Sequence, residues 1–250
     1  MIFLKFRKQL VLLSLMTALG LNGQGAAVSA KTSPPAAPAP ASATSAASVS
    51  KIESMVKASQ FDQALSALKA DKAKLQPAAY HYYSGVCYSR KKEYRNARKH
   101  LRIAIRLGRG SRYSQAANQE IMKVPAEYIK PRTGSATRFL ASLFGFSKDR
   151  GVGGKPPSPT VIDFYASWCQ PCKKLEQDMG TISQRYGDKV NFMRVDVDDP
   201  KNQKMVDQYE ISPIPTVIFL NADGEVVDYS IGYSGEKSIS RGIEKILPGA

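Results

Sequence analysis

Cysteine, histidine and tryptophan are scarce in this chain of 250 residues, which contains three cysteines, two histidines and one tryptophan. Three cysteines are too few for a disulfide-rich scaffold, because such folds depend on several bridges. Both histidines, His81 and His100, lie far along the chain from the pair Cys169 and Cys172. A zinc site of four ligands would have to recruit distant side chains. The sequence therefore argues against a metal site and against a fold held together by disulfides.

Acidic residues are also few, since 21 Asp and Glu stand against 36 Lys and Arg and give a formal net charge of +15. The deficit is uneven, with 22 basic and 7 acidic residues over 51–158 but 10 basic and 14 acidic over 159–250. Such an asymmetry indicates two modules with different partners. A basic module can attract nucleic acid, an anionic membrane or an acidic protein. Because no nucleic-acid-binding motif is present, nucleic acid is not the expected partner.

The N-terminal segment has the features of an export signal. An apolar run of twelve residues, Leu10 to Leu21, follows three basic residues, and small residues end at Ala30. The run is shorter than the roughly 20 residues that a membrane-spanning helix needs. We therefore predict a signal peptide over 1–30, with an uncleaved anchor as the alternative. Both interpretations place the folded part outside the cytoplasm, in a periplasm or secreted, and 31–50 is predicted to be a flexible linker rich in Pro, Ala and Ser.

The segment 51–130 has helical periodicity and contains an approximate repeat. The stretch SQFDQALSAL at 59–68 aligns with KEYRNARKHL at 92–101 at a shift of 33 residues. This spacing resembles the tetratricopeptide repeat, whose period is about 34 residues. Gly85 and Ala97 would let two antiparallel helices approach closely. We predict an all-α, tetratricopeptide-like domain that binds a protein partner, with helical hairpins that lack a peptide groove as the alternative.

Two further features separate this region from the C-terminal module. Cys87 lies on the same predicted helix as Gly85 and is expected to be a buried structural residue, because an unpaired cysteine usually behaves as a small hydrophobe. Residues 131–158 are predicted to be a connector, since glycine and proline make its ends loose.

Strand and helix signals alternate from 159 to 250. The apolar run TVIDFYA at 160–166 is typical of a central strand that is covered on both faces. An Asp-Gly pair at Asp223 and Gly224 predicts a tight hairpin. The predicted order is strand 160–166, helix 169–186, strand 190–198, helix 201–209, hairpin strands 216–221 and 225–232, and helix 234–247. This is the order of an α/β fold.

The motif ASWCQPCKK at 166–174 places two cysteines three residues apart at a predicted junction of strand and helix. The pair could cycle between dithiol and disulfide, hold a metal or staple the fold. A staple is disfavoured because so short a loop removes little entropy from the unfolded chain, and a metal is disfavoured for want of ligands. Unpaired N–H groups at the helix start would stabilise the thiolate of Cys169, which we expect to be the exposed nucleophile. Cys172, one turn further along the helix, would attack and resolve the mixed disulfide. Pro171 limits where the helix can start and how far apart the two sulfurs lie.

The segments VIDFYASWCQPCKK and ISPIPTVIFL together resemble thioredoxin, and the resemblance covers 159–250. It implies a thioredoxin-like α/β fold and a redox-active disulfide, Cys169–Cys172, with no other cofactor. It further implies that Asp163 exchanges a proton with Cys172, and that Arg194 stands where the family often has a lysine. Arginine does not lose its proton and could form a salt bridge with Asp163 instead.

The resemblance also implies a substrate groove beside the cysteines. Pro215 matches a cis proline, and the backbone of the preceding Ile214 would pair with a substrate peptide. Trp168 and Gly232 would complete this groove. Gln170 stands where thioredoxin usually has glycine, and the residues between the cysteines tune the redox potential in the family. The first strand and helix of a full thioredoxin are not evident before Thr160.

These features predict an exported thiol–disulfide oxidoreductase that reduces disulfides in protein substrates. A reductase outside the cytoplasm would need a membrane electron donor. The alternatives are a disulfide oxidase or isomerase, and an adaptor in which the helical repeats bind a partner and the redox module is secondary.

Overall fold

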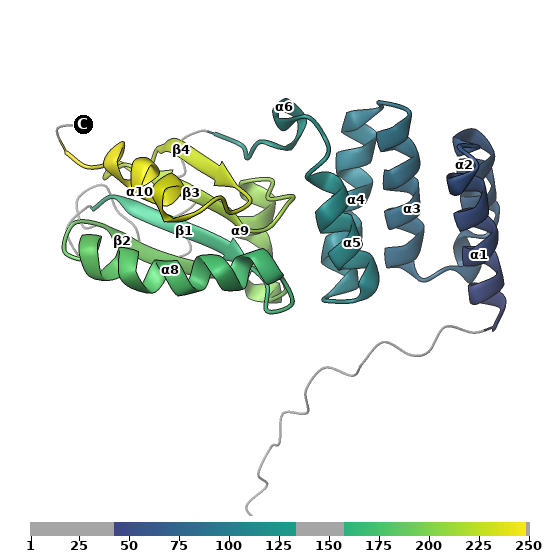
Figure 1. The fold of residues 1–250 in the computed structure, drawn as a ribbon, viewed down its shortest axis with the longest axis horizontal. Helices are drawn as coiled ribbons and strands as arrows, with labels where there is room; N and C mark the ends of the chain where they lie inside the picture. Colours follow the sequence, from purple (N-terminus) through teal and green to yellow (C-terminus); the bar gives the residue numbers. More distant parts are fainter. Residues whose placement is uncertain (1–42, 134–157, 249–250) are drawn as a thin grey trace, which may run out of the picture. The chain divides into compact units, whose positions relative to one another are not determined.

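The fold was analysed in a computed structural model that describes residues 43–133 and 158–248. These residues belong to one compact unit spanning 41–250, in which an N-terminal helical region precedes a C-terminal α/β domain (Figure 1). The predicted signal peptide at 1–30 and most of the predicted connector at 131–158 lie outside the described residues. No helix among 43–133 and 158–248 is long and apolar enough to cross a membrane.

Six α-helices make up the described helical region. Their pairing depends on small residues at the contacts, because a Cβ placed on Gly85 would lie 2.6 Å from Cγ of Leu101. Gly85 on α3 (Pro77–Arg90) therefore permits the close approach of α4 (Tyr94–Gly108) that the sequence predicted. Cys87 is fully buried and unpaired, and burial raises the pKa of its thiol to about 11. The helices are α1 Ala43–Lys57, α2 Phe61–Ala70, α3 Pro77–Arg90, α4 Tyr94–Gly108, α5 Arg112–Ile121 and α6 Ala126–Ile129.

Helix α1 corrects the predicted end of the linker. The flexible segment was expected to reach residue 50, but the helix begins at Ala43. No proline follows Pro40 in this stretch, and alanine is the best helix former, so the backbone can become helical. Val49 and Ile52 are buried in the helical core, which gives the helix tertiary support that composition alone did not indicate.

The C-terminal domain is built on a four-stranded sheet in the order β2-β1-β3-β4. Strand β1 lies parallel to β2 and antiparallel to β3, and β3 pairs antiparallel with β4. The predicted strands and helices of this domain are therefore present, with ends shifted by a few residues. The strands are β1 Thr160–Tyr165, β2 Asn191–Asp196, β3 Thr216–Leu220 and β4 Val226–Ile231; the helices are α8 Gln170–Tyr186, α9 Gln203–Gln208 and α10 Glu236–Glu244.

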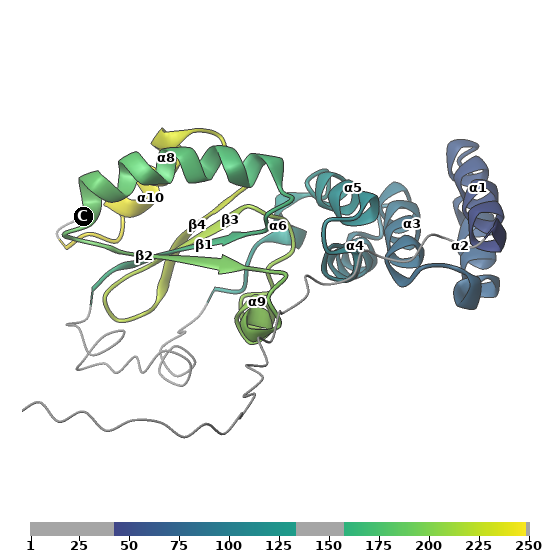
Figure 2. The same ribbon diagram turned by 90° about the horizontal axis from the view of Figure 1, so that it is seen from below.

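Helices cover both faces of this sheet. Figure 2 shows α8 and α10 on one face and α9 on the other. Residues alternate between the faces along β1: Val161 packs in the core with α8 and α10, whereas Ile162 and Phe164 pack in the core with α9. Asp163 follows the same alternation and lies on the α8 face. Both faces are thus buried, as the mostly apolar run predicted.

Candidate redox-active site

Cys169 and Cys172 form a disulfide at the N-terminal end of α8, with an S–S distance of 2.06 Å and a Cα–Cα distance of 5.2 Å. Cys169 is the N-cap residue of the helix, and the backbone N–H of Cys172 donates a hydrogen bond to its Sγ at 3.2 Å. Gln170 and Pro171 occupy the first helical positions and are exposed. After reduction, the same N–H group and the helix dipole would stabilise a thiolate at Cys169.

The burial of Cys169 corrects one prediction. The nucleophile was expected to be exposed, but Cys169 is 2% exposed and Cys172 is 1% exposed. Cys169, Cys172 and Ile214 belong to one buried cluster. Residues from α5 and the turn before it lie against the neighbouring positions, which is a tertiary contact that the local motif does not encode.

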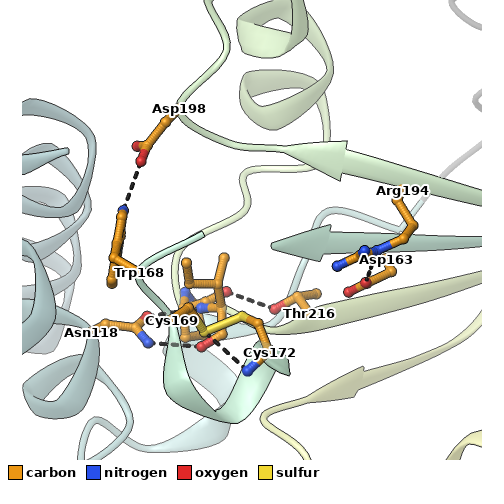
Figure 3. Close-up of a disulfide and its surroundings, with 10 residues drawn as sticks. Asn118, Asp163, Trp168, Cys169, Cys172, Arg194, Asp198 and Thr216 are labelled. Atoms are coloured by element: carbon orange, nitrogen blue, oxygen red, sulfur yellow. Dashed lines mark hydrogen bonds and ion pairs between the residues drawn. A yellow bond between two sulfur atoms is a disulfide. The ribbon is translucent and has the colours of Figure 1, made fainter. Parts of the chain in front are cut away.

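Ile214 is hydrogen-bonded to the helical region. The peptide bond between Ile214 and Pro215 is cis, as the resemblance implied. The N–H of Ile214 donates to Oδ1 of Asn118 at 2.8 Å, and Nδ2 of Asn118 donates to the carbonyl oxygen of Ile214 at 2.7 Å (Figure 3). Asn118 lies on α5, and 96 residues separate the two partners in sequence. Sequence reasoning missed Asn118, because no local pattern indicates so distant a contact.

Trp168 and Gly232 also meet the helical region. A Cβ on Gly110, which has a φ of +84°, would lie 2.9 Å from Cδ1 of Trp168. The indole Nε1–H of Trp168 donates to Asp198 at 2.7 Å. Gly232 has a φ of +74°, and its N–H donates to the carbonyl of Pro215 at 2.8 Å. A Cβ on Gly232 would lie 3.0 Å from Cε of Met122.

Asp163 is a fully buried carboxylate on β1. Burial raises its pKa to about 6, although Arg194 opposes the rise through a hydrogen bond from Nε to Oδ2 at 3.2 Å. Arg194 also forms an ion pair with Glu176 of α8 and lies over the ring of Tyr165, 4.0 Å from its centroid. Arg194 therefore forms the salt bridge expected of it. In the described part of the chain, no hydrogen bond joins Asp163 to either cysteine, and its Oδ1 has no hydrogen-bond partner.

Two arginines of α4 hold the helical region against α9 and the segment that follows it. Arg98 donates from Nη1 to the carboxylate of Glu210 at 3.0 Å, from Nη2 to the carbonyl of Glu210 at 2.8 Å, and from Nε to Ser212 at 3.0 Å. Arg102 donates to the carbonyl of Ile211 at 3.0 Å and to the carboxylate of Asp207 at 2.7 Å. These bonds fix α4, and with it α5, close to Ile214.

The site offers no metal centre within 43–133 and 158–248, where no group of three or more His, Cys, Asp or Glu could hold an ion. The redox group that the geometry supplies is the disulfide itself.

Comparison with known proteins agrees with this geometry. The family model described as thioredoxin matches residues 154–245. A thioredoxin from Borreliella burgdorferi is 32% identical over 98 residues, which are 39% of this chain and 81% of that protein. The chain belongs to the thioredoxin family. Its C-terminal domain is a thioredoxin-type oxidoreductase with a CxxC disulfide, and thioredoxins act on proteins that contain disulfides.

Two further similarities were found. The chloroplastic thioredoxin-like protein HCF164 of Arabidopsis thaliana is 42% identical over 66 residues, but the match spans only 25% of that protein and 26% of this chain. The solved structure of oxidised mitochondrial thioredoxin 3 from Saccharomyces cerevisiae is 26% identical, with a TM-score of 0.34, and covers 44% of this chain and 89% of that one. The described helices α1–α6 end before residue 154, where the family match begins.

Proposed function

We propose that this chain is an exported thiol–disulfide oxidoreductase that reduces disulfides in protein substrates. The observation that carries the proposal is the Cys169–Cys172 disulfide at the first turn of α8. The same domain holds the buried carboxylate of Asp163 on β1. Trp168, Ile214, Pro215 and Gly232 would form the groove that receives the substrate.

The reaction begins with both cysteines reduced. The Cys169 thiolate attacks one sulfur of the substrate disulfide, forms a mixed disulfide and expels the other substrate sulfur as a thiolate. Cys172 then loses its proton, which Asp163 would accept, and attacks Sγ of Cys169. The Cys169–Cys172 disulfide forms, and the second substrate sulfur leaves as a thiolate. The substrate gains two electrons, the protein loses two, and both substrate thiolates take up protons.

Regeneration requires two electrons and two protons for the Cys169–Cys172 disulfide. We propose a membrane dithiol carrier as their source, because the N-terminal sequence supports a location outside the cytoplasm. An oxidase would instead pass its disulfide to reduced substrates. Measurement of the reduction potential separates the two directions, since a value near about −120 mV, typical of a strong oxidant, would contradict a reductase.

Substrate trapping tests the chemistry directly. In the full chain, Cys172→Ser should accumulate mixed disulfides through Cys169, visible as adducts on non-reducing gels that dithiothreitol removes. Cys169→Ser, the matched control, should form none. Adducts in both variants, or in neither, would contradict the assignment of Cys169 as the nucleophile.

For the helical region we propose a tetratricopeptide-like role in binding an acidic protein partner. Support comes from a cavity of about 480 Å³ beside α4, where Arg95 and Lys99 face the same space as Arg98, Arg102 and Arg106. A glutamate-rich peptide serves as the probe in calorimetric titration. Arg95→Glu with Lys99→Glu should weaken binding, whereas Lys57→Glu with Lys69→Glu, on α1 and α2, should not. Equal losses in both pairs would indicate attraction by net charge alone.

Export is tested independently of catalysis. Cell fractionation should place the chain outside the cytoplasm, and the mass of the mature protein should show whether cleavage follows Ala30 or the segment remains as an anchor. Recovery of the intact chain in the cytoplasm would refute export.

A further inference from the structure

The main chain of Ile214 is already paired in this structure. Its N–H and its carbonyl oxygen bond to the two ends of one amide, that of Asn118, at 2.8 Å and 2.7 Å. A side-chain amide carries a donor and an acceptor, as a peptide unit does. Asn118 thus makes with Ile214 the pair of bonds that an extended substrate backbone makes in strand-like pairing. Both bonds are buried.

The same short segment meets the other groove positions. Gly110 contacts Trp168 so closely that a Cβ would lie 2.9 Å from the indole, and Met122 lies against Gly232. Three residues between 110 and 122 therefore lie on three of the positions assigned to the substrate. Cys169 belongs to one buried cluster with Ile214, against which Trp168 packs, and is 2% exposed.

We propose that the segment 110–122 is an intramolecular competitor of the substrate, and that Asn118 is its specificity-determining residue. The proposal rests on the proposed function, because it takes Ile214 as the substrate-pairing position. Substrates gain access when α5 leaves Ile214. A substrate competes effectively only if its own main chain replaces both hydrogen bonds of Asn118 to Ile214. Disulfides that lie in extended segments of a substrate are therefore favoured over disulfides in compact, folded segments.

The competition has a kinetic signature. A closed form that cannot bind substrate raises the apparent KM by the inverse of the open fraction and leaves kcat unchanged. Asn118→Ala leaves the N–H and carbonyl of Ile214 without partners in the closed form, so it shifts the population towards the open form. A residue that only supported folding would instead lower kcat or the amount of active protein.

The experiment uses the full chain, with dithiothreitol as the reductant. Two rates are measured: reduction of insulin disulfides, and alkylation of reduced Cys169 by iodoacetamide, followed by peptide mass spectrometry. Asn118→Ala should lower KM and raise the alkylation rate, each by about tenfold, as expected for the loss of two hydrogen bonds. The matched control is Asn96→Ala on α4, whose exposed amide bonds to Glu93, and it should change neither.

An unchanged alkylation rate in a folded Asn118→Ala variant would overturn the proposal. Asn118→Asp provides a second test if the alanine variant fails to fold. It retains the size and the acceptor for the N–H of Ile214 but sets a carboxylate oxygen against the carbonyl, so it should also open the site. Faster alkylation without insulin reduction in any variant would support the competitor and refute the proposed reductase. Insulin reduction with an unchanged alkylation rate in both Asn118 variants would support the proposed reductase and refute the intramolecular competitor.

Discussion

Arg194 donates a hydrogen bond from Nε to Oδ2 of Asp163 at 3.2 Å, so a guanidinium contacts a carboxylate that has no exposed surface. Burial outweighs this contact and raises the pKa of Asp163 from its usual 3.8 to about 6. Asp163 therefore ionises close to neutral pH, where a group that exchanges protons with a thiol is most effective.

Replacement of Asp163 should stabilise the oxidised protein above pH 6. Between pH 3.8 and about 6 the folded protein binds the Asp163 proton more tightly than the unfolded chain does, so stability falls as the pH rises through this range and stays low above it. A difference of roughly two pH units corresponds to about 3 kcal/mol. Denaturant unfolding of Asp163→Asn should show up to this gain at about pH 7.5 and little gain at about pH 4. Asp188→Asn, which removes an exposed carboxylate, should give a curve parallel to wild type, and a parallel curve for Asp163→Asn would contradict the raised pKa.

Resolution of the mixed disulfide should depend on the ionisation of the same residue. If Asp163 accepts the proton of Cys172, the rate should rise through about pH 6 in the wild type. Asp163→Asn should be slower, by about a hundredfold, and should lack this rise, because general-base assistance contributes factors of this order. Stopped-flow mixing of the reduced protein with a model disulfide gives both profiles. If the rate of the Asp163→Asn variant still rose near pH 6, the ionisation that controls the rate would belong to another group.

Arg194→Gln should raise the pKa of Asp163 above about 6, because the hydrogen bond and charge of Arg194 lower it in the wild type. The rise in the pH–rate profile should move upward with it. Carbon NMR of the Asp163 side chain measures the pKa directly. Arg185→Gln provides the control, since that arginine pairs with Glu236 instead. A lower pKa in Arg194→Gln would contradict the arrangement described.

Two glycine substitutions should act in opposite directions. Gly85→Ala places a Cβ 2.6 Å from Leu101, so α3 and α4 must separate, and the free energy of unfolding should fall by about 1–3 kcal/mol. Gly180→Ala, on the exposed side of α8, meets nothing within 4 Å and should raise it by about 0.5–1 kcal/mol. Thermal unfolding of both variants checks the pair. Equal effects would mean that the contact of Gly85 with Leu101 is not tight.

High salt should weaken the contact between α4 and the C-terminal domain and make Cys169 more accessible. Arg98 and Arg102 are partly exposed, and the attraction to Glu210 and Asp207 weakens when the Debye length falls to about 3 Å at 1 M salt. The rate at which neutral iodoacetamide alkylates reduced Cys169 should therefore increase with sodium chloride. Arg102→Met should show the faster rate already at low salt. Arg95→Met, an exposed arginine of the same helix with no ion pair among the described residues, should follow the wild type.

The sequence predicted the C-terminal domain well because its signals are local. The apolar strand around Asp163 and the helix that begins beside Cys169 follow from short patterns, and the structure contains both. The cis proline at 215, which the resemblance to thioredoxin implied, is also present. Asp163, flanked by Ile162 and Phe164 in β1, is fully buried with them. The family comparison then confirmed the thioredoxin domain.

The contacts between the helices and the site could not be predicted. Asn118 reads as an ordinary polar residue of a helix, and only the tertiary fold brings it to Ile214. The burial of Cys169 depends on the tertiary packing of its cluster, which includes Phe164 and Ile214, whereas the motif predicts only the start of a helix. The start of α1 at Ala43 was missed because composition rich in alanine and serine suits a linker as well as a helix, and packing of Ile52 decides between them.

The third cysteine has a consequence for a protein that undergoes repeated thiol exchange. Cys87 is enclosed within the helical core, and a thiol with a pKa near 11 is almost entirely protonated at neutral pH. It cannot compete for the Cys169–Cys172 bridge or capture a substrate while the helices remain folded. Cys87 therefore does not form incorrect disulfides during catalytic turnover. A disulfide or alkylation adduct at Cys87 would indicate that the helical region has unfolded.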